Sequence, residues 1–286
     1  MTEEPARFLA AYDALVDRWP LPVERIDLVS PHGTTRVTAC GPADGEPLVL
    51  LHGGGATAAV WFANVAELGR TRRVYAVDRI GEPGRSRPGE RPPRSVADLH
   101  DWLSGVLDGL QLDRTDLCGH SYGAWTALTY ALHAPRRVRR LVLLDPTQCF
   151  AGFRAGYLLR ALPVLLRPSA ARARAFLRWE TGGSAAAVDP GWLEVYALGA
   201  ALPRGTVVIG RRPAARLLRE SAVPTLVLLA GESRAHDSRR VEAAARQALP
   251  HARTAVLPDV SHHALPFTGA AELDRLVLEF LAAPDE

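Results

Sequence analysis

The sequence of 286 residues contains no lysine, so all 34 of its basic residues are arginine, against 31 acidic residues. Chemistry that needs a lysine amine, such as Schiff-base formation, is therefore excluded. The net charge is only +3, and the arginines are spread along the chain without a block of five or more like charges. This distribution is not the basic patch typical of nucleic-acid binding, and we expect no nucleic-acid partner.

Cysteine is scarce, and long apolar runs are missing. The three cysteines, Cys40, Cys118 and Cys149, cannot all pair and show no CxxC spacing, which argues against a disulfide framework and a metal site. No segment approaches about 18 apolar residues. Residues 8–19 form a short amphipathic stretch rather than the apolar core of a signal peptide. These features predict a soluble, cytoplasmic protein without a membrane partner or a bound metal.

Strand and helix patterns alternate through most of the chain. Helices with one apolar face are expected at residues 99–110 and around 273–281, and a further helix at 122–133, while residues 8–19 are amphipathic. Short apolar or alternating runs predict strands at 23–29, 34–40, 47–51, 73–77, 115–118, 138–144, 224–230 and 254–257. Such alternation predicts an α/β fold with a mainly parallel central sheet flanked by helices.

The alternation stops between residues 147 and 222, where the pattern is helical without strands, with helices expected at 153–166, 170–179 and 192–198. We therefore predict a core formed by residues 1–146 and 223–286, interrupted by a helical cap at 147–222. The aromatic side chains of Tyr157, Trp179 and Trp192 are expected to line a substrate pocket beneath this cap.

A GxSxG pentapeptide, Gly119 to Gly123, stands between the strand expected at 115–118 and the helix expected at 122–133. A sharp turn in this position exposes the serine hydroxyl, and its glycines allow close approach of the backbone. Ser121 is therefore the candidate nucleophile. A second glycine run, His52 to Gly55, follows the strand expected at 47–51.

These two segments, with the DRIGEPGRS stretch at residues 78–86, resemble the α/β-hydrolase superfamily, in particular its serine hydrolases with a helical cap. The resemblance implies an oxyanion hole formed by the backbone N–H groups of Gly54 and Tyr122. It also implies that His262, in the PDVSH segment after the last strand, is the general base. His263 is the alternative, since a shift of one residue would exchange the two.

The acid that orients the base departs from the family pattern. Its common position, three residues beyond Gly231, holds Arg234. We therefore expect the acid to be Asp145, at the end of the strand 138–144, where some superfamily members place it. The main alternative is Asp237, which also suits the N-cap of a helix beginning near residue 239. Glu232 is a third candidate, one residue past the end of its strand.

Together these residues predict a serine hydrolase that cleaves an ester, thioester or related acyl bond through an acyl-serine intermediate, without a cofactor. The partner is expected to be a small, apolar or acyl substrate, and a homo-oligomer is possible. Two alternatives stay open, because a fold does not determine a reaction. One is a cofactor-free lyase, cyclase or acyltransferase. The other is a non-catalytic binding protein, for which the cation at Arg234 is the supporting feature.

Overall fold

A computed structural model describes residues 3–182 and 188–284. Within them, nine strands form one sheet in the order β1-β2-β4-β3-β6-β7-β8-β9, with β5 paired to β2. Strand β2 runs antiparallel to its neighbours, and β4, β3 and β6 to β9 are mutually parallel. The strands are β1 (Glu24–Ser30), β2 (Gly33–Cys40), β3 (Glu46–Leu51), β4 (Arg72–Val77), β5 (Arg87–Pro88), β6 (Thr115–His120), β7 (Val138–Leu144), β8 (Thr225–Ala230) and β9 (Arg253–Leu257).

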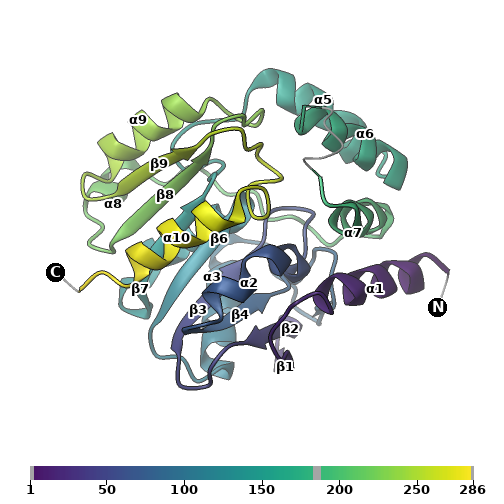
Figure 1. Ribbon diagram of the computed structural model, residues 1–286, viewed down its shortest axis with the longest axis horizontal. Coiled ribbons are helices and arrows are strands. Elements are labelled where there is room, and N and C mark those ends of the chain that lie inside the picture. The colour runs from purple at the N-terminus through teal and green to yellow at the C-terminus, as the bar shows by residue number, and fades with distance from the viewer. Residues whose placement is uncertain (1–2, 183–187, 285–286) are drawn as a thin grey trace.

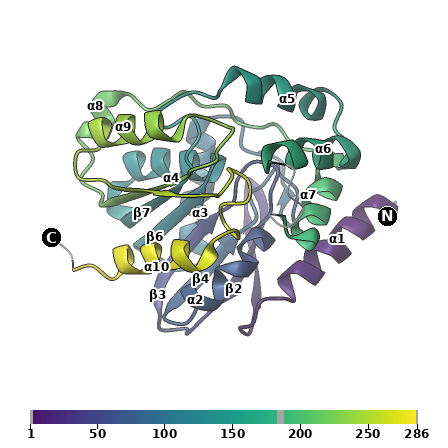
Figure 2. The ribbon, with the colours of Figure 1, turned by 45° about the horizontal axis from the view of Figure 1, so that its top comes forward.

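Helices cover both faces of the sheet (Figures 1 and 2), and nearly every residue of its central strands β3, β6, β7 and β8 is buried, as expected for parallel strands covered on two sides. One hydrophobic cluster joins the sheet to α3 (Val96–Gly109), α4 (Tyr122–His133) and α9 (Ser238–Ala248). The other joins it to α1 (Glu3–Val16), α2 (Val65–Leu68) and α10 (Ala270–Leu281). Two short 3-10 helices, η1 (Ala58–Ala63) and η2 (Pro135–Arg137), complete the connections.

Three helices between β7 and β8 lie together to one side of the sheet (Figure 1): α5 (Ala155–Leu166), α6 (Ala170–Glu180) and α7 (Pro190–Ala201). The N-terminal helix α1 packs against α7, and just beyond α1 the guanidinium of Arg18 contacts the carboxylate of Asp189 at 2.8 Å. Helix α8 (Ala215–Arg219) belongs to the same sequence segment, yet it packs against α9 of the core. The cap-like group is therefore α5 to α7.

The predicted α/β architecture is confirmed, and each predicted strand is present with its ends shifted by at most two residues. The described residues between β7 and β8 contain no strand, as predicted. The sequence reading missed α2, α8 and β5, which are short. The amphipathic stretch at 8–19 overlaps α1, which begins at Glu3 and ends at Val16.

Candidate active site

Ser121 occupies a sharp turn between β6 and α4. Its backbone has φ 54° and ψ −113°, a strained conformation for a residue with a side chain. The turn brings chain segments into contact, so that a Cβ on Gly119 would lie 2.3 Å from the carbonyl oxygen of Gly123. A Cβ on Gly123 would lie 2.3 Å from the carbonyl oxygen of Leu51. Both glycines of the pentapeptide are therefore required by close backbone approach.

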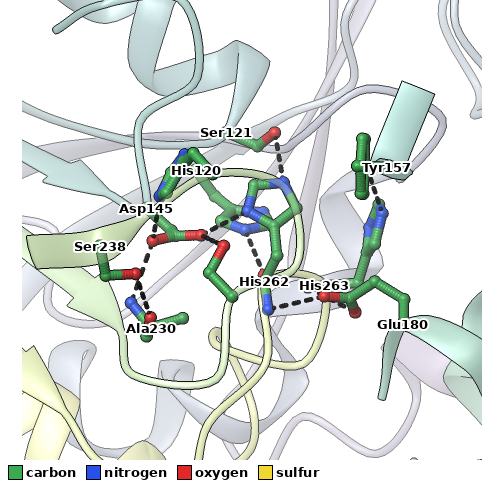
Figure 3. Close-up of polar contacts among 11 residues, drawn as sticks. His120, Ser121, Asp145, Tyr157, Glu180, Ala230, Ser238, His262 and His263 are labelled. Atoms are coloured by element: carbon green, nitrogen blue, oxygen red, sulfur yellow. Dashed lines mark hydrogen bonds and ion pairs between the residues drawn. The ribbon is translucent and has the colours of Figure 1, made fainter. Parts of the chain in front are cut away.

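Three predicted site residues form one hydrogen-bonded chain (Figure 3). The Oγ atom of Ser121 lies 2.8 Å from Nε2 of His262, and Nδ1 of His262 lies 2.5 Å from Oδ2 of Asp145. All three side chains are buried. The fold thus brings together the candidate nucleophile at the end of β6, the candidate acid at the end of the adjacent β7, and the candidate base after β9.

Asp145 accepts three further hydrogen bonds. Its Oδ1 atom accepts from the backbone N–H of Ala230 at 3.0 Å and from Nε2 of His236 at 2.9 Å. Its Oδ2 atom also accepts from the hydroxyl of Ser233 at 2.8 Å. Burial alone would raise the pKa of Asp145, but the charge and hydrogen bond of His236, together with those of His262, hold that pKa well below its ordinary value. Asp145 is therefore an anion at neutral pH.

The alternative acids are placed differently. Asp237 is the exposed N-cap of α9, where its Oδ1 atom accepts the backbone N–H of Arg240 at 3.1 Å. Glu232 is exposed. Arg234, in the common position of the family acid, lies over the ring of Trp179 at 5.1 Å. No hydrogen bond within residues 3–182 and 188–284 joins either alternative carboxylate to the candidate base.

The sequence reading missed two residues that hold the backbone of His262. The backbone N–H of His262 donates to Oε1 of Glu180 at 3.0 Å, and its carbonyl oxygen accepts from Nε2 of His120 at 2.9 Å. Burial lowers the pKa of His262, but the hydrogen bond and charge of Asp145 and the charge of Glu180 raise it above its ordinary value. His120 could have been suspected from the sequence, because it is the second residue of the GxSxG segment. No sequence feature marks Glu180 as part of the site.

The predicted oxyanion residues lie side by side, since a Cβ on Gly54 would be 3.8 Å from Cβ of Tyr122. Tyr122 begins α4, where backbone N–H groups have no partner within the helix. The glycine loop is anchored from outside, because the N–H of Gly55 donates to Oε2 of Glu82 at 3.1 Å. Glu82 in turn pairs with the buried Arg79, whose guanidinium lies 4.0 Å from the ring centre of Tyr122.

The cavity beside Ser121 is small, about 10 Å³, which holds about one water molecule. Of the three aromatic residues predicted to line a pocket, Trp192 lines this one, and Trp179 does not. Its lining residues are Gly53, Gly54, Ala56, Val60, His120, Ser121, Trp192 and His263. Any organic substrate therefore needs a wider opening than the structure shows.

His263, the alternative base, faces the same cavity but contacts the cap. The hydroxyl of Tyr157 on α5 lies 3.1 Å from Nε2 of His263. Burial, reinforced by the charge of His262, lowers the pKa of His263 well below its ordinary value, so its ring is neutral. Burial raises the pKa of Tyr157, so its hydroxyl keeps its proton and shares a hydrogen bond with Nε2 of His263. Tyr157 thus reaches the site through His263.

Residues 3–182 and 188–284 contain no group of three or more histidine, cysteine, aspartate or glutamate side chains that could hold a metal ion. None of the helices in the same residues is long and apolar enough to cross a bilayer.

Carboxylesterases of Bacillus subtilis are among the known proteins to which this chain is similar. Carboxylesterase YbfK of Bacillus subtilis is 34% identical over 182 residues, 64% of this chain and 60% of that protein, so the match spans less than two thirds of its relative. The crystal structure of carboxylesterase CesB (YbfK) superposes with TM-score 0.92, at 26% identity over 99% of this chain and 100% of that chain. The crystal structure of naproxen esterase from Bacillus subtilis superposes with TM-score 0.91, at 25% identity over 98% of this chain and 99% of that chain.

The model of the Alpha/beta hydrolase family matches residues 48–276, which include every residue of the hydrogen-bonded chain and the glycine loop. The chain belongs to the alpha/beta hydrolase family.

Proposed function

We propose that this protein is a carboxylesterase that hydrolyses a carboxylic ester through an acyl intermediate on Ser121. The observation that carries the proposal is the continuous chain from Ser121 through His262 to Asp145, with distances of 2.8 and 2.5 Å. An isolated serine hydroxyl is a poor nucleophile, and this arrangement supplies both a base and a group that orients the base. The carboxylesterase relatives support the same reaction.

In the proposed mechanism, Oγ of Ser121 attacks the ester carbonyl carbon while its proton passes to Nε2 of His262. The anionic Asp145 stabilises the imidazolium that forms. The negative charge on the carbonyl oxygen is held by the backbone N–H groups of Gly54 and Tyr122. Collapse of the intermediate breaks the carbon–oxygen bond, and His262 returns the proton to the leaving alcohol. Water then attacks the acyl carbon while Nε2 of His262 takes its proton. Collapse of this second intermediate breaks the bond to Oγ of Ser121, His262 returns the proton to Oγ, and the carboxylic acid leaves.

Helices α5 to α7 form, in this proposal, a cap that covers the site and selects the substrate. The cavity beside Ser121 is lined by the apolar side chains of Ala56, Val60 and Trp192, which favours a small apolar acyl group. Its volume of about 10 Å³ means that the cap must move to admit a substrate. We also propose a cytoplasmic location, because all three cysteines are buried free thiols, a state that a reducing compartment preserves.

The test is a comparison of Ser121→Ala with a matched control, Ser104→Ala, whose hydroxyl contacts that of Tyr130 at 3.2 Å, outside the site. Turnover of p-nitrophenyl esters of increasing acyl length should fall by at least about 10³-fold in Ser121→Ala and stay near wild type in the control. A fluorophosphonate probe should label Ser121, as mapped by mass spectrometry. Activity above a few per cent in Ser121→Ala, or an adduct on another residue, would overturn the assignment.

The same experiment separates the alternatives. An inert Ser121 in the folded wild type would favour a binding protein. Transfer of the acyl group from the same intermediate to an added alcohol, in preference to water, would favour an acyltransferase.

A further inference from the structure

Glu180 is the last residue of α6, so it comes from the cap, yet its side chain reaches the loop that carries the candidate base (Figure 3). It is 1% exposed. A carboxylate is costly to bury unless its charge and lone pairs are compensated, so the contacts of Glu180 call for a functional explanation.

Both oxygens of Glu180 contact the backbone of the base loop. Oε1 accepts the N–H of His262 at 3.0 Å, and Oε2 accepts the N–H of the next residue, His263, at 3.2 Å. One carboxylate therefore fixes two consecutive peptide groups. From the opposite side, the carbonyl of His262 accepts a hydrogen bond from His120 at 2.9 Å, while Asp145 holds the ring.

The electrostatic surroundings of His262 give Glu180 a second effect. The ionisable groups that face the ring are the carboxylates of Asp145 and Glu180 and the imidazoles of His120, His236 and His263. The phenol of Tyr157 also lies against the ring, and burial raises its pKa. Burial lowers the pKa of both His120 and His263, so those two rings are neutral. Burial raises the pKa of Glu180 above its ordinary value, although the charge of His262 and the hydrogen bonds from the base loop act in the opposite direction. In its ionised form Glu180 is a second negative charge that favours the imidazolium form of His262.

We propose that Glu180 is a positioning residue through which the cap orients the base, His262. Resting on the proposed function, this inference adds that the base is fully oriented only while α6 lies over the site. The small cavity must widen when substrate enters, and α7 of the cap contributes Trp192 to its wall. A cap displaced far from the core takes the carboxylate of Glu180 with it, and the base loop then loses two hydrogen bonds and a stabilising charge. Hydrolysis is thereby tied to cap positions in which Glu180 still reaches the base loop.

The experiment compares Glu180→Gln, Glu180→Asp and the control Glu194→Gln. Glu194 is a cap carboxylate on α7 that is 38% exposed and pairs with Arg174, so the control makes the same chemical change away from the site. Two readouts are needed: the pH profile of kcat/KM for a p-nitrophenyl ester, and an NMR titration of the His262 ring.

In Glu180→Gln we expect kcat to fall roughly tenfold to a hundredfold, since a misplacement of about 1 Å has an effect of that size. The pKa of His262 should fall, because a neighbouring negative charge is lost, and the acid limb of the profile should move to lower pH. Glu180→Asp retains the charge on a shorter side chain. It should therefore keep the acid limb closer to that of the wild type while still losing rate.

An unchanged His262 titration in Glu180→Gln would overturn the proposal, as would an equal effect in Glu194→Gln. If Glu180→Gln does not fold, Glu180→Asp decides the question, because a rate equal to wild type excludes a positioning role. Failure of the proposed function has a different signature. The wild type then hydrolyses no ester, whereas the NMR titration still tests whether Glu180 acts on His262.

Discussion

The orientation of the base by Asp145 allows a detailed prediction for Asp145→Asn. Four donors surround this carboxylate, and one of them, the backbone N–H of Ala230, can never act as an acceptor. The asparagine must therefore turn its amide oxygen, not its NH₂ group, toward Ala230 and the neighbouring His236. The amide NH₂ group then faces the ring of His262 and the hydroxyl of Ser233, which can rotate to accept. The NH₂ group donates to Nδ1 of the histidine, and the ring proton moves to Nε2.

That tautomer cannot take a proton from Ser121, so kcat should fall by roughly three to four orders of magnitude with little change in KM. This loss corresponds to about 4 to 5 kcal/mol in the activation barrier, because each tenfold loss of rate is about 1.4 kcal/mol. Steady-state kinetics on a p-nitrophenyl ester would measure it, and ¹⁵N NMR of the imidazole would show the tautomer directly.

Asp237→Asn is the matched control. Asparagine is as good an N-cap as aspartate, so the first turn of α9 should persist, and only the exposed ion pair with Arg154 at 3.2 Å is lost. We expect nearly full kcat and a change of less than about 1 kcal/mol in the free energy of unfolding. If Asp145→Asn folds and keeps more than about a tenth of wild-type kcat, or if Asp237→Asn shows the collapse, the assignment of the acid is wrong.

Two further predictions concern stability, as measured by chemical denaturation. Burial raises the pKa of Asp274 to about 7, and the amide of Asn64 donates a hydrogen bond to its Oδ1 atom at 2.8 Å. Since the folded-state pKa lies above the unfolded value near 4, this group stabilises the protein most below pH 4, and the contribution is lost as pH rises to 7. In Asp274→Asn the free energy of unfolding should no longer fall over this pH range. The expected difference from the wild type is a few kcal/mol, at about 1.4 kcal/mol per pKa unit. If the free energy of unfolding depends on pH equally in both proteins, the prediction is wrong. Gly123→Ala should lower the free energy of unfolding by about 1 to 3 kcal/mol or more, because the new Cβ would lie 2.3 Å from a backbone oxygen. The control is Gly105→Ala on α3, where a new Cβ would have no other atom within 4 Å. This change should raise the free energy of unfolding by about 0.5 to 1 kcal/mol.

Local patterns in the sequence were sufficient to predict the sheet and two members of the hydrogen-bonded chain. Ser121 directly follows β6, and His262 lies in the loop after β9, which ends at Leu257. Both positions therefore depend on short-range signals that a motif records. Asp145 could be predicted for a similar reason, since a residue ending the strand next to β6 must lie near Ser121 in a parallel sheet. Because Arg234 occupies the usual position of the acid, the sequence also indicated that the acid lies elsewhere.

The contribution of the cap could not be predicted in the same way. Glu180 meets His262 across 82 residues of sequence, and the contact depends on how α6 packs over the core. No periodicity or motif encodes that packing. The same applies to Trp179, which was expected in the pocket but packs between Tyr157 and Phe176. The helical pattern of residues 147–222 predicted a cap, and its aromatic residues were expected in the pocket, but the sequence did not distinguish residues that line the cavity from residues that pack among the helices.

At Ser121 the residue that the proposed reaction needs is not the residue that would give the protein the greatest thermodynamic stability. A conformation with φ 54° and ψ −113° suits glycine and disfavours every residue with a side chain, at a cost on the order of 1 to 3 kcal/mol. Selection for folding alone would therefore replace this serine by glycine, and a stability-guided redesign would do the same. Under the proposed function, the serine is retained for chemistry, and a stabilised variant of this chain that has lost it would keep the architecture while losing the hydroxyl on which the proposed reaction depends.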